Sequence, residues 1–120
     1  MIITLGVIFG LAWTNFAQTN AGDYKKVETS DAAVVAAADF AIEAQSERAE
    51  AGIELLSIEQ AERRTAAEGI DFKLCIQVNI VDLKTDKPYE KFVNAEIFVN
   101  AKNEHALRSW TETESCGAKQ

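Results

Sequence analysis

The first 21 residues of this 120-residue chain contain no charged side chain, and this absence divides the sequence. All 12 basic and 19 acidic residues lie after Ala21, so residues 22–120 carry the whole net charge of −7. A domain with this acidic balance is repelled by phosphate backbones and by anionic membrane surfaces. We therefore expect a single domain whose partner is neither nucleic acid nor a membrane.

Long apolar runs are also missing. The run from Ile2 to Trp13 is short for a membrane span, which needs roughly 20 residues. It predicts a secretory signal over residues 1–21, with cleavage after Ala21 or after Ala17, although no Lys or Arg precedes it. An uncleaved anchor or a buried N-terminal helix is the alternative. No Cys lies directly after the run, so a bacterial lipid anchor is not indicated. We expect a secreted protein, extracellular or periplasmic, with its domain at residues 22–120.

Cysteine and histidine are scarce: the chain has two cysteines, Cys75 and Cys116, and one histidine, His105. The two cysteines could pair in an oxidising compartment. However, we expect Cys75 in mid-strand and Cys116 in a loose tail at residues 115–120, with a further strand between them. Because neighbouring strands lie about 4.8 Å apart, we expect the pair to be beyond disulfide reach unless the tail folds back.

The same scarcity limits the chemistry of the chain. Cys75 and His105 could be a nucleophile and its base, but we expect Cys75 to be an unreactive thiol on a strand and His105 to be solvated in a turn. Asp82, Asp86 and Glu90 lie near one turn, yet their spacing cannot supply the 6–8 oxygens that Ca²⁺ takes. We therefore expect no catalytic residue, no metal and no cofactor.

One helix is predicted from Asp31 to about Ala49, where neither Gly nor Pro occurs. Thr29, Ser30 and Asp31 offer capping oxygens at its start, and Gly52 is expected to end it. A mostly small-sided stripe repeats at helical spacing: Val34, Ala37, Ala38, Ala41, Ile42 and Gln45. Such a face can lie close against a sheet, whose larger side chains then fill the core.

Strands are predicted around this helix. A short extended segment reaches Val27, and four strands follow the helix at residues 53–64, 70–80, 92–101 and 107–113. The second of these four alternates cleanly between apolar and polar residues, whereas the first breaks the period of two and predicts a bulge. Pro88, the only proline, places a turn at residues 86–88. The order predicts an α+β fold, with a single long helix packed on a curved antiparallel sheet of four to five strands.

Three short segments carry a resemblance to a known family. Gly22 precedes the first extended segment; Ala38-Asp39-Phe40-Ala41-Ile42 lies on the helix; Gly69-Ile70-Asp71-Phe72-Lys73-Leu74 begins the alternating strand. Their order and spacing resemble the cystatins over almost all of residues 22–120. The resemblance implies a sheet wrapped around one helix and a wedge that plugs, without covalent chemistry, the active-site cleft of papain-like cysteine proteases.

The resemblance assigns the wedge to three places, and two of them depart from the family. The first hairpin reads Gln-Val-Val-Ala-Gly in cystatins, whereas this chain has Thr65, Ala66, Ala67, Glu68 and Gly69, or Arg64 in the Gln position if the loop has gained a residue. We expect Gly69 to supply the positive φ of a tight turn. The second hairpin presents Pro-Trp in the family, and here it presents Lys102 and Asn103. Gly22 matches the glycine of the N-terminal trunk.

Three functions remain open. The first is a weak secreted inhibitor of a papain-like cysteine protease, acting through these residues. The second is a non-inhibitory module that binds another protein through the same scaffold. The third, an enzyme or ligand pocket of the ketosteroid-isomerase outline, usually has more helices before the sheet and a longer chain. The oligomeric state also stays open between a monomer and a domain-swapped dimer that exchanges its N-terminal half.

Overall fold

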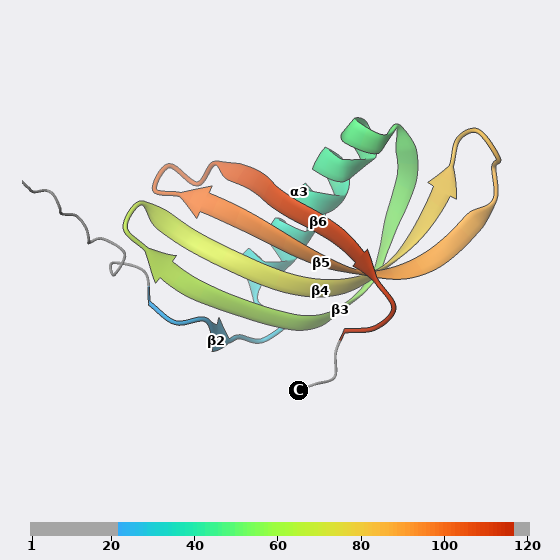
Figure 1. Cartoon of the computed structure of the whole chain (residues 1–120). Helices are drawn as coiled ribbons and strands as arrows, with labels where there is room; N and C mark the ends of the chain where they lie inside the picture. Colours follow the sequence, from blue (N-terminus) through green and yellow to red (C-terminus); the bar gives the residue numbers. More distant parts are fainter. Residues whose placement is uncertain (1–21, 117–120) are drawn as a thin grey trace, which may run out of the picture.

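The computed structural model describes residues 22–116, which form one helix and a five-stranded antiparallel sheet. The elements are β2 (Lys25–Lys26), α3 (Ala32–Ala49), β3 (Ala51–Ala66), β4 (Gly69–Asp82), β5 (Pro88–Asn100) and β6 (His105–Thr113). Figure 1 shows the helix lying across one face of a sheet whose long strands curve around it. The expected α+β class with a single long helix on an antiparallel sheet is confirmed.

Helix α3 begins as predicted. The Asp31 carboxylate accepts a hydrogen bond of 2.8 Å from the Ala33 amide, which satisfies one free donor of the first turn. Four residues of the predicted stripe, Val34, Ala37, Ala38 and Ala41, are wholly inaccessible to solvent, and Ile42 and Gln45 are half-buried. These short side chains let the helix axis approach the sheet closely, so larger strand residues fill the remaining space.

The end of the helix differs from the prediction. Glu50 adopts the left-handed conformation (φ 53°, ψ 47°), and its amide donates to the Ser46 carbonyl. Gly52, which we expected to be the stop, already belongs to β3. The helix therefore turns directly into the sheet at a residue that lacks the conformational freedom of glycine.

The sheet has the order β2-β3-β4-β5-β6, so every strand pairs with its neighbour in sequence. The predicted alternation of β4 is confirmed, because the side chains facing the helix are almost fully buried there: Phe72, Leu74, Ile76, Val78 and Ile80. Val93, Ala95 and Ile97 of β5 and Leu107 of β6 complete the core. Trp110 of β6 packs partly buried against it.

The predicted irregularity of β3 takes the form of two bulges. The pairing of β3 with β4 shifts once between Leu55 and Ser57 and again between Ile58 and Gln60. A bulge bends its strand and increases the local twist, and Figure 1 shows β3 curving beside the helix. The strands also run longer than predicted, because ladder pairing continues past the positions where the apolar alternation stops. Pro88 is the first residue of β5, where its missing donor costs no pairing inside the strand.

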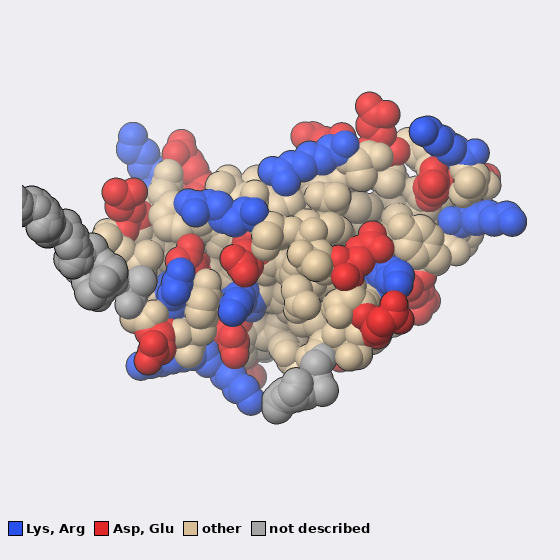
Figure 2. All heavy atoms as spheres, viewed as in Figure 1, with Lys and Arg blue, Asp and Glu red and all other residues tan. Residues whose placement is uncertain are grey.

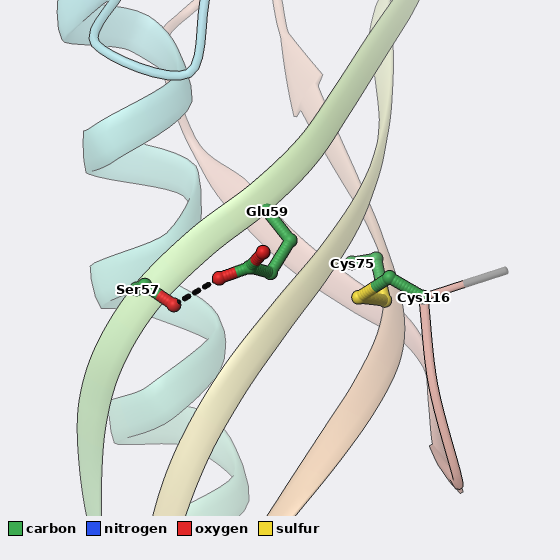
Figure 3. Close-up of a disulfide and its surroundings, with 4 residues drawn as sticks. All are labelled: Ser57, Glu59, Cys75 and Cys116. Carbon is green, nitrogen blue, oxygen red and sulfur yellow. Dashed lines mark hydrogen bonds between the residues drawn. A yellow bond between two sulfur atoms is a disulfide. The ribbon is translucent and has the colours of Figure 1, made fainter. Parts of the chain in front are cut away.

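The expectation that Cys75 and Cys116 stay apart is wrong. They form a disulfide with a Cα–Cα separation of 5.6 Å. After β6 the chain turns back over the outer face of the sheet and crosses β5 to reach β4, as Figures 1 and 3 show. The loose-tail prediction therefore fails for residues 115 and 116, and Cys75 is a buried half-cystine rather than a thiol on a wet face.

Several predictions fall on residues outside the described range. The secretory signal at residues 1–21 and its cleavage site lie there, as do residues 117–120 of the tail. Within residues 22–116, no helix has both the length and the apolar character to cross a membrane.

Reduction of the disulfide should lower the stability of the domain. The bond joins residues 41 positions apart, and a closed loop of that length corresponds to about 4 kcal/mol in the chain-entropy description. Denaturant unfolding with and without reductant should show a loss of this order. The Cys116→Ser variant should match the reduced protein and respond no further to reductant. Equal unfolding midpoints for the oxidised and reduced protein would contradict the assignment.

Candidate functional site

The two predicted hairpin tips lie side by side at one end of the sheet. Residues 67–68 form the first tip, between β3 and β4, and residues 101–104 form the second, between β5 and β6. Gly69 pairs with both Ala66 across the first hairpin and Asn100 across the central ladder. The pairing of β4 with β5 therefore brings together two tips that are separated by more than 30 positions in the sequence.

The N-terminal segment joins the same end. The Gly22 amide donates a 3.1 Å hydrogen bond to the Thr65 carbonyl, and the Val27 amide donates a 3.0 Å bond to the Ala61 carbonyl. Between them, Lys25 and Lys26 pair with β3 as strand β2. We call the surface formed by Gly22, residues 65–69 and residues 101–104 the three-segment edge. All eight predicted site residues lie on it: Gly22, Thr65, Ala66, Ala67, Glu68, Gly69, Lys102 and Asn103.

The first tip is a two-residue turn of exposed side chains. Ala67 and Glu68 are exposed, and neither has a positive φ. Gly69 does not adopt the left-handed conformation either, so the predicted reason for a glycine there is wrong. The reason is close approach instead, because a Cβ at residue 69 would lie 2.8 Å from the Phe98 ring and 2.9 Å from the Asn100 Cα.

The second tip is held together by Asn100, which the sequence reasoning missed. The Asn100 side-chain oxygen accepts from the amides of Lys102 and Glu104, each at 2.9 Å, and its side-chain nitrogen donates to the Glu104 carboxylate at 2.8 Å. Asn103 takes a positive φ of 66° to close the turn. An asparagine just before a polar turn is the available signal, because its amide commonly bonds backbone groups two residues on.

Tyr24, also missed by the sequence reasoning, fastens the N-terminal segment to the outer face of the sheet. Its ring lies 4.6 Å from the Arg64 guanidinium carbon and 4.7 Å from the Lys73 ammonium. Arg64 in turn forms a 3.0 Å ion pair with Asp71. Burial raises the pKa of the Tyr24 hydroxyl above 10.0 and Asp71 adds to the rise, although Arg64 opposes it. Both contacts join Tyr24 to residues about 40 or more positions away, so no local sequence pattern predicts them.

The residues considered for catalysis have other partners. Cys75 is bonded to Cys116, so the hypothetical pairing with His105 has no thiol. His105 is not solvated in a turn as expected. It begins β6 and packs partly buried against Phe40, with 5.2 Å between the ring centroids. Asp82 accepts a 2.7 Å bond from the Lys84 amide within its own turn. Among residues 22–116, no group of three His, Cys, Asp or Glu side chains could hold a metal ion.

Comparison with known proteins assigns no family. No protein-family model matches the chain, and a search of curated proteins finds no match.

Gly69→Ala should separate β4 from β5 at the three-segment edge. The added methyl would meet the Val99 carbonyl and the Phe98 ring well inside contact distance, and overpacking of this kind costs about 1–3 kcal/mol. Gly52→Ala is the matched control, since a Cβ there has its nearest neighbour at 3.8 Å and should leave stability within about 0.5 kcal/mol or raise it. Urea unfolding of the two variants measures the difference. Equal stabilities would contradict the close-approach explanation.

Asn100→Ala should loosen the second tip without unfolding the domain. It removes the acceptor of the Lys102 and Glu104 amides, and each such bond contributes about 0.5–1.5 kcal/mol. Hydrogen exchange of these two amides should accelerate by about tenfold or more. Asn94→Ala, on the exposed side of the same strand, should leave both rates unchanged. Similar rates in the two variants would show that Asn100 does not hold the turn.

Proposed function

We propose that the protein is a cystatin-like secreted inhibitor that occludes the active-site cleft of a papain-like cysteine protease without covalent chemistry. The binding residues are Gly22, the first tip at residues 65–69, and Lys102 with Asn103 of the second tip. No group of the inhibitor reacts in this mechanism, because the protruding edge blocks access of substrate to the protease.

The observation that carries the proposal is the three-segment edge itself. Three stretches far apart in the sequence are fixed next to one another by the Gly22–Thr65 hydrogen bond and the pairing of Gly69 with Asn100. An occluding wedge needs this kind of narrow, protruding and preorganised edge, because ordering flexible loops on binding lowers affinity. The ladder pairs and the Asn100 bonds supply that order before any partner arrives.

The chemistry of the edge indicates weak inhibition. Each Ala in place of a family Val removes on the order of 1.5 kcal/mol of apolar contact, and an absent Trp anchor removes about 2 kcal/mol or more. Glu68 would need a partner or solvent, because a bare buried carboxylate is costly. The deficit of roughly 5 kcal/mol corresponds to three to four decades in affinity.

A non-inhibitory protein-binding module is the second candidate, favoured by the polarity of both tips. Glu68 is exposed at the first tip, and Lys102, Asn103 and Glu104 are all exposed at the second. A charged edge of this kind suits a polar partner surface better than an apolar cleft. On this candidate the same three segments bind another protein.

Secretion is supported by the Cys75–Cys116 bond. Structural disulfides form and persist in oxidising compartments and are rare in the cytosol. The bond thus agrees with the proposed signal at residues 1–21, which predicts an extracellular or periplasmic protein.

Titration of papain activity with residues 22–120 tests the proposal. We expect weak inhibition by the natural sequence. A variant with Thr65→Gln, Ala66→Val, Ala67→Val, Glu68→Ala and Lys102→Trp should bind about three to four decades more tightly, because it restores the apolar contacts of the edge.

The matched control places equivalent changes at the opposite end of the sheet. Thr85→Gln with Lys87→Trp alters the exposed β4–β5 turn and should leave inhibition unchanged. Nanomolar inhibition by the natural sequence would refute the weakness we infer from the tips. No gain from the restored edge would favour the protein-binding module.

A further inference from the structure

A basic groove adjoins the N-terminal segment of this acidic protein. The groove has a volume of about 640 Å³ and runs between β2 and the end of β3. Its lining contains four basic side chains and one acidic one: Lys25, Lys26, Arg63, Arg64 and Asp23. Figure 2 shows basic side chains along the lower left edge of the molecule, interspersed with acidic ones, where Figure 1 places β2.

Two of these cations face each other directly. Lys25 of β2 is the ladder partner of Arg63 of β3, so their side chains leave the same face of the sheet directly opposite one another. Within the described part of the chain, neither Lys25 nor Arg63 forms an ion pair. Like charges directly opposite one another destabilise a strand pair. The folded protein therefore holds two opposed positive charges in the groove, and Asp23 is the one acidic residue of its lining.

The other two cations each have an acidic residue directly opposite in a ladder, Asp71 for Arg64 and Glu62 for Lys26. Arg64 lies on the opposite face, where it bonds Asp71 and covers the Tyr24 ring. This difference singles out Lys25 and Arg63 as the pair that an external anion would neutralise. A bound anion would bridge the two side chains and so replace their repulsion with attraction.

The size and surroundings of the groove select the kind of anion. The whole chain carries a net charge of −7, so a long polyanion such as nucleic acid or a sulfated polysaccharide would be repelled wherever it extends beyond the groove. A protein segment with a few carboxylates places its negative charge only where the cations are. The exposed Lys25 and the half-buried Arg63 match such a short acidic stretch.

We propose that the Lys25–Arg63 groove is a binding site for a short acidic segment of a protein partner. The site goes beyond the proposed inhibition, and its argument does not depend on whether the three-segment edge enters a protease. Because Gly22 and Thr65 border both surfaces, one partner protein could be contacted by the groove and the edge together.

The test uses a fluorescently labelled ten-residue peptide with four consecutive glutamates as probe, and residues 22–120 as binding protein. Anisotropy should show binding that weakens as NaCl rises from about 50 to 500 mM. Lys25→Gln should weaken binding about two- to fivefold, and Lys25→Gln with Arg63→Gln about tenfold. A probe with glutamine in place of glutamate should not bind.

Lys84→Gln is the matched control, because it makes the same charge change on an exposed lysine of the distant β4–β5 turn. It should leave the affinity within about twofold. Urea unfolding distinguishes a binding role of Lys25 from a structural one, because loss of a structural residue would lower the unfolding midpoint. Lys25→Gln should leave the unfolding midpoint unchanged or raise it, because it removes the repulsion from Arg63.

Three results would overturn the proposal. These are equal loss of peptide binding in Lys25→Gln and Lys84→Gln, a lower unfolding midpoint in Lys25→Gln, and absence of peptide binding at 50 mM NaCl. Tighter binding of a heparin oligosaccharide or of single-stranded DNA than of the peptide would assign the groove to a polyanion instead. The peptide assay contains no protease, so its outcome is separate from that of the papain titration.

Discussion

The packing of the small-sided face of α3 against the apolar face of the sheet is the constraint on which the rest of this structure depends. Val34, Ala37, Ala38 and Ala41 are wholly buried, and Ile76 and Val78 lie equally buried on the sheet. Alanine supplies little apolar area of its own, so the helix gains stability only by coming near enough for the longer strand side chains to pack around it. A sheet that meets this demand has to bend, and the two bulges of β3 provide the bend.

The curved sheet also explains why the three-segment edge lies away from the core. The ladders run on beyond the part of the sheet that the helix covers, so both hairpins end in exposed side chains. An exposed edge of this kind is shaped by backbone pairing and by turn hydrogen bonds rather than by burial. Apart from Gly69, whose site has no room for a Cβ, its side chains can therefore vary with little effect on folding. The fold of the edge and its chemistry are for this reason separate questions.

Local patterns predicted the elements well. The Asp31 cap, the buried helix stripe, the alternation of β4 and the broken period of β3 all follow from properties of neighbouring residues. Features that depend on distant residues were predicted poorly. Glu50 stands in the left-handed region that glycine usually occupies, the return of Cys116 to β4 depends on the path of the chain over β5, and Gly69 is required by the backbone of β5 rather than by its own turn.

The candidate site divides in the same way. The resemblance to cystatins assigned its eight residues to one wedge, and their role in binding stays a prediction. The ladder pairing brings the first and second tips to the same end of the sheet. Asn100, Tyr24 and the Lys25–Arg63 pair were not anticipated, because each acts through a cross-strand or within-turn contact that a linear pattern does not contain. That Lys25 and Arg63 lie opposite one another can be seen only once the register of β2 on β3 is known.

The bond between Cys75 and Cys116 has a consequence for how two copies of this chain could exchange parts. It covalently closes a unit that contains the rest of β4, all of β5 and all of β6. Those strands must stay within one molecule as long as the bond is intact. Exchange between copies is therefore confined to elements that precede Cys75, and opening at the Ala67-Glu68 turn would hand over β2, α3 and β3 as one piece. The oxidation state of Cys75 and Cys116 thus determines which elements of the fold can be exchanged between two copies.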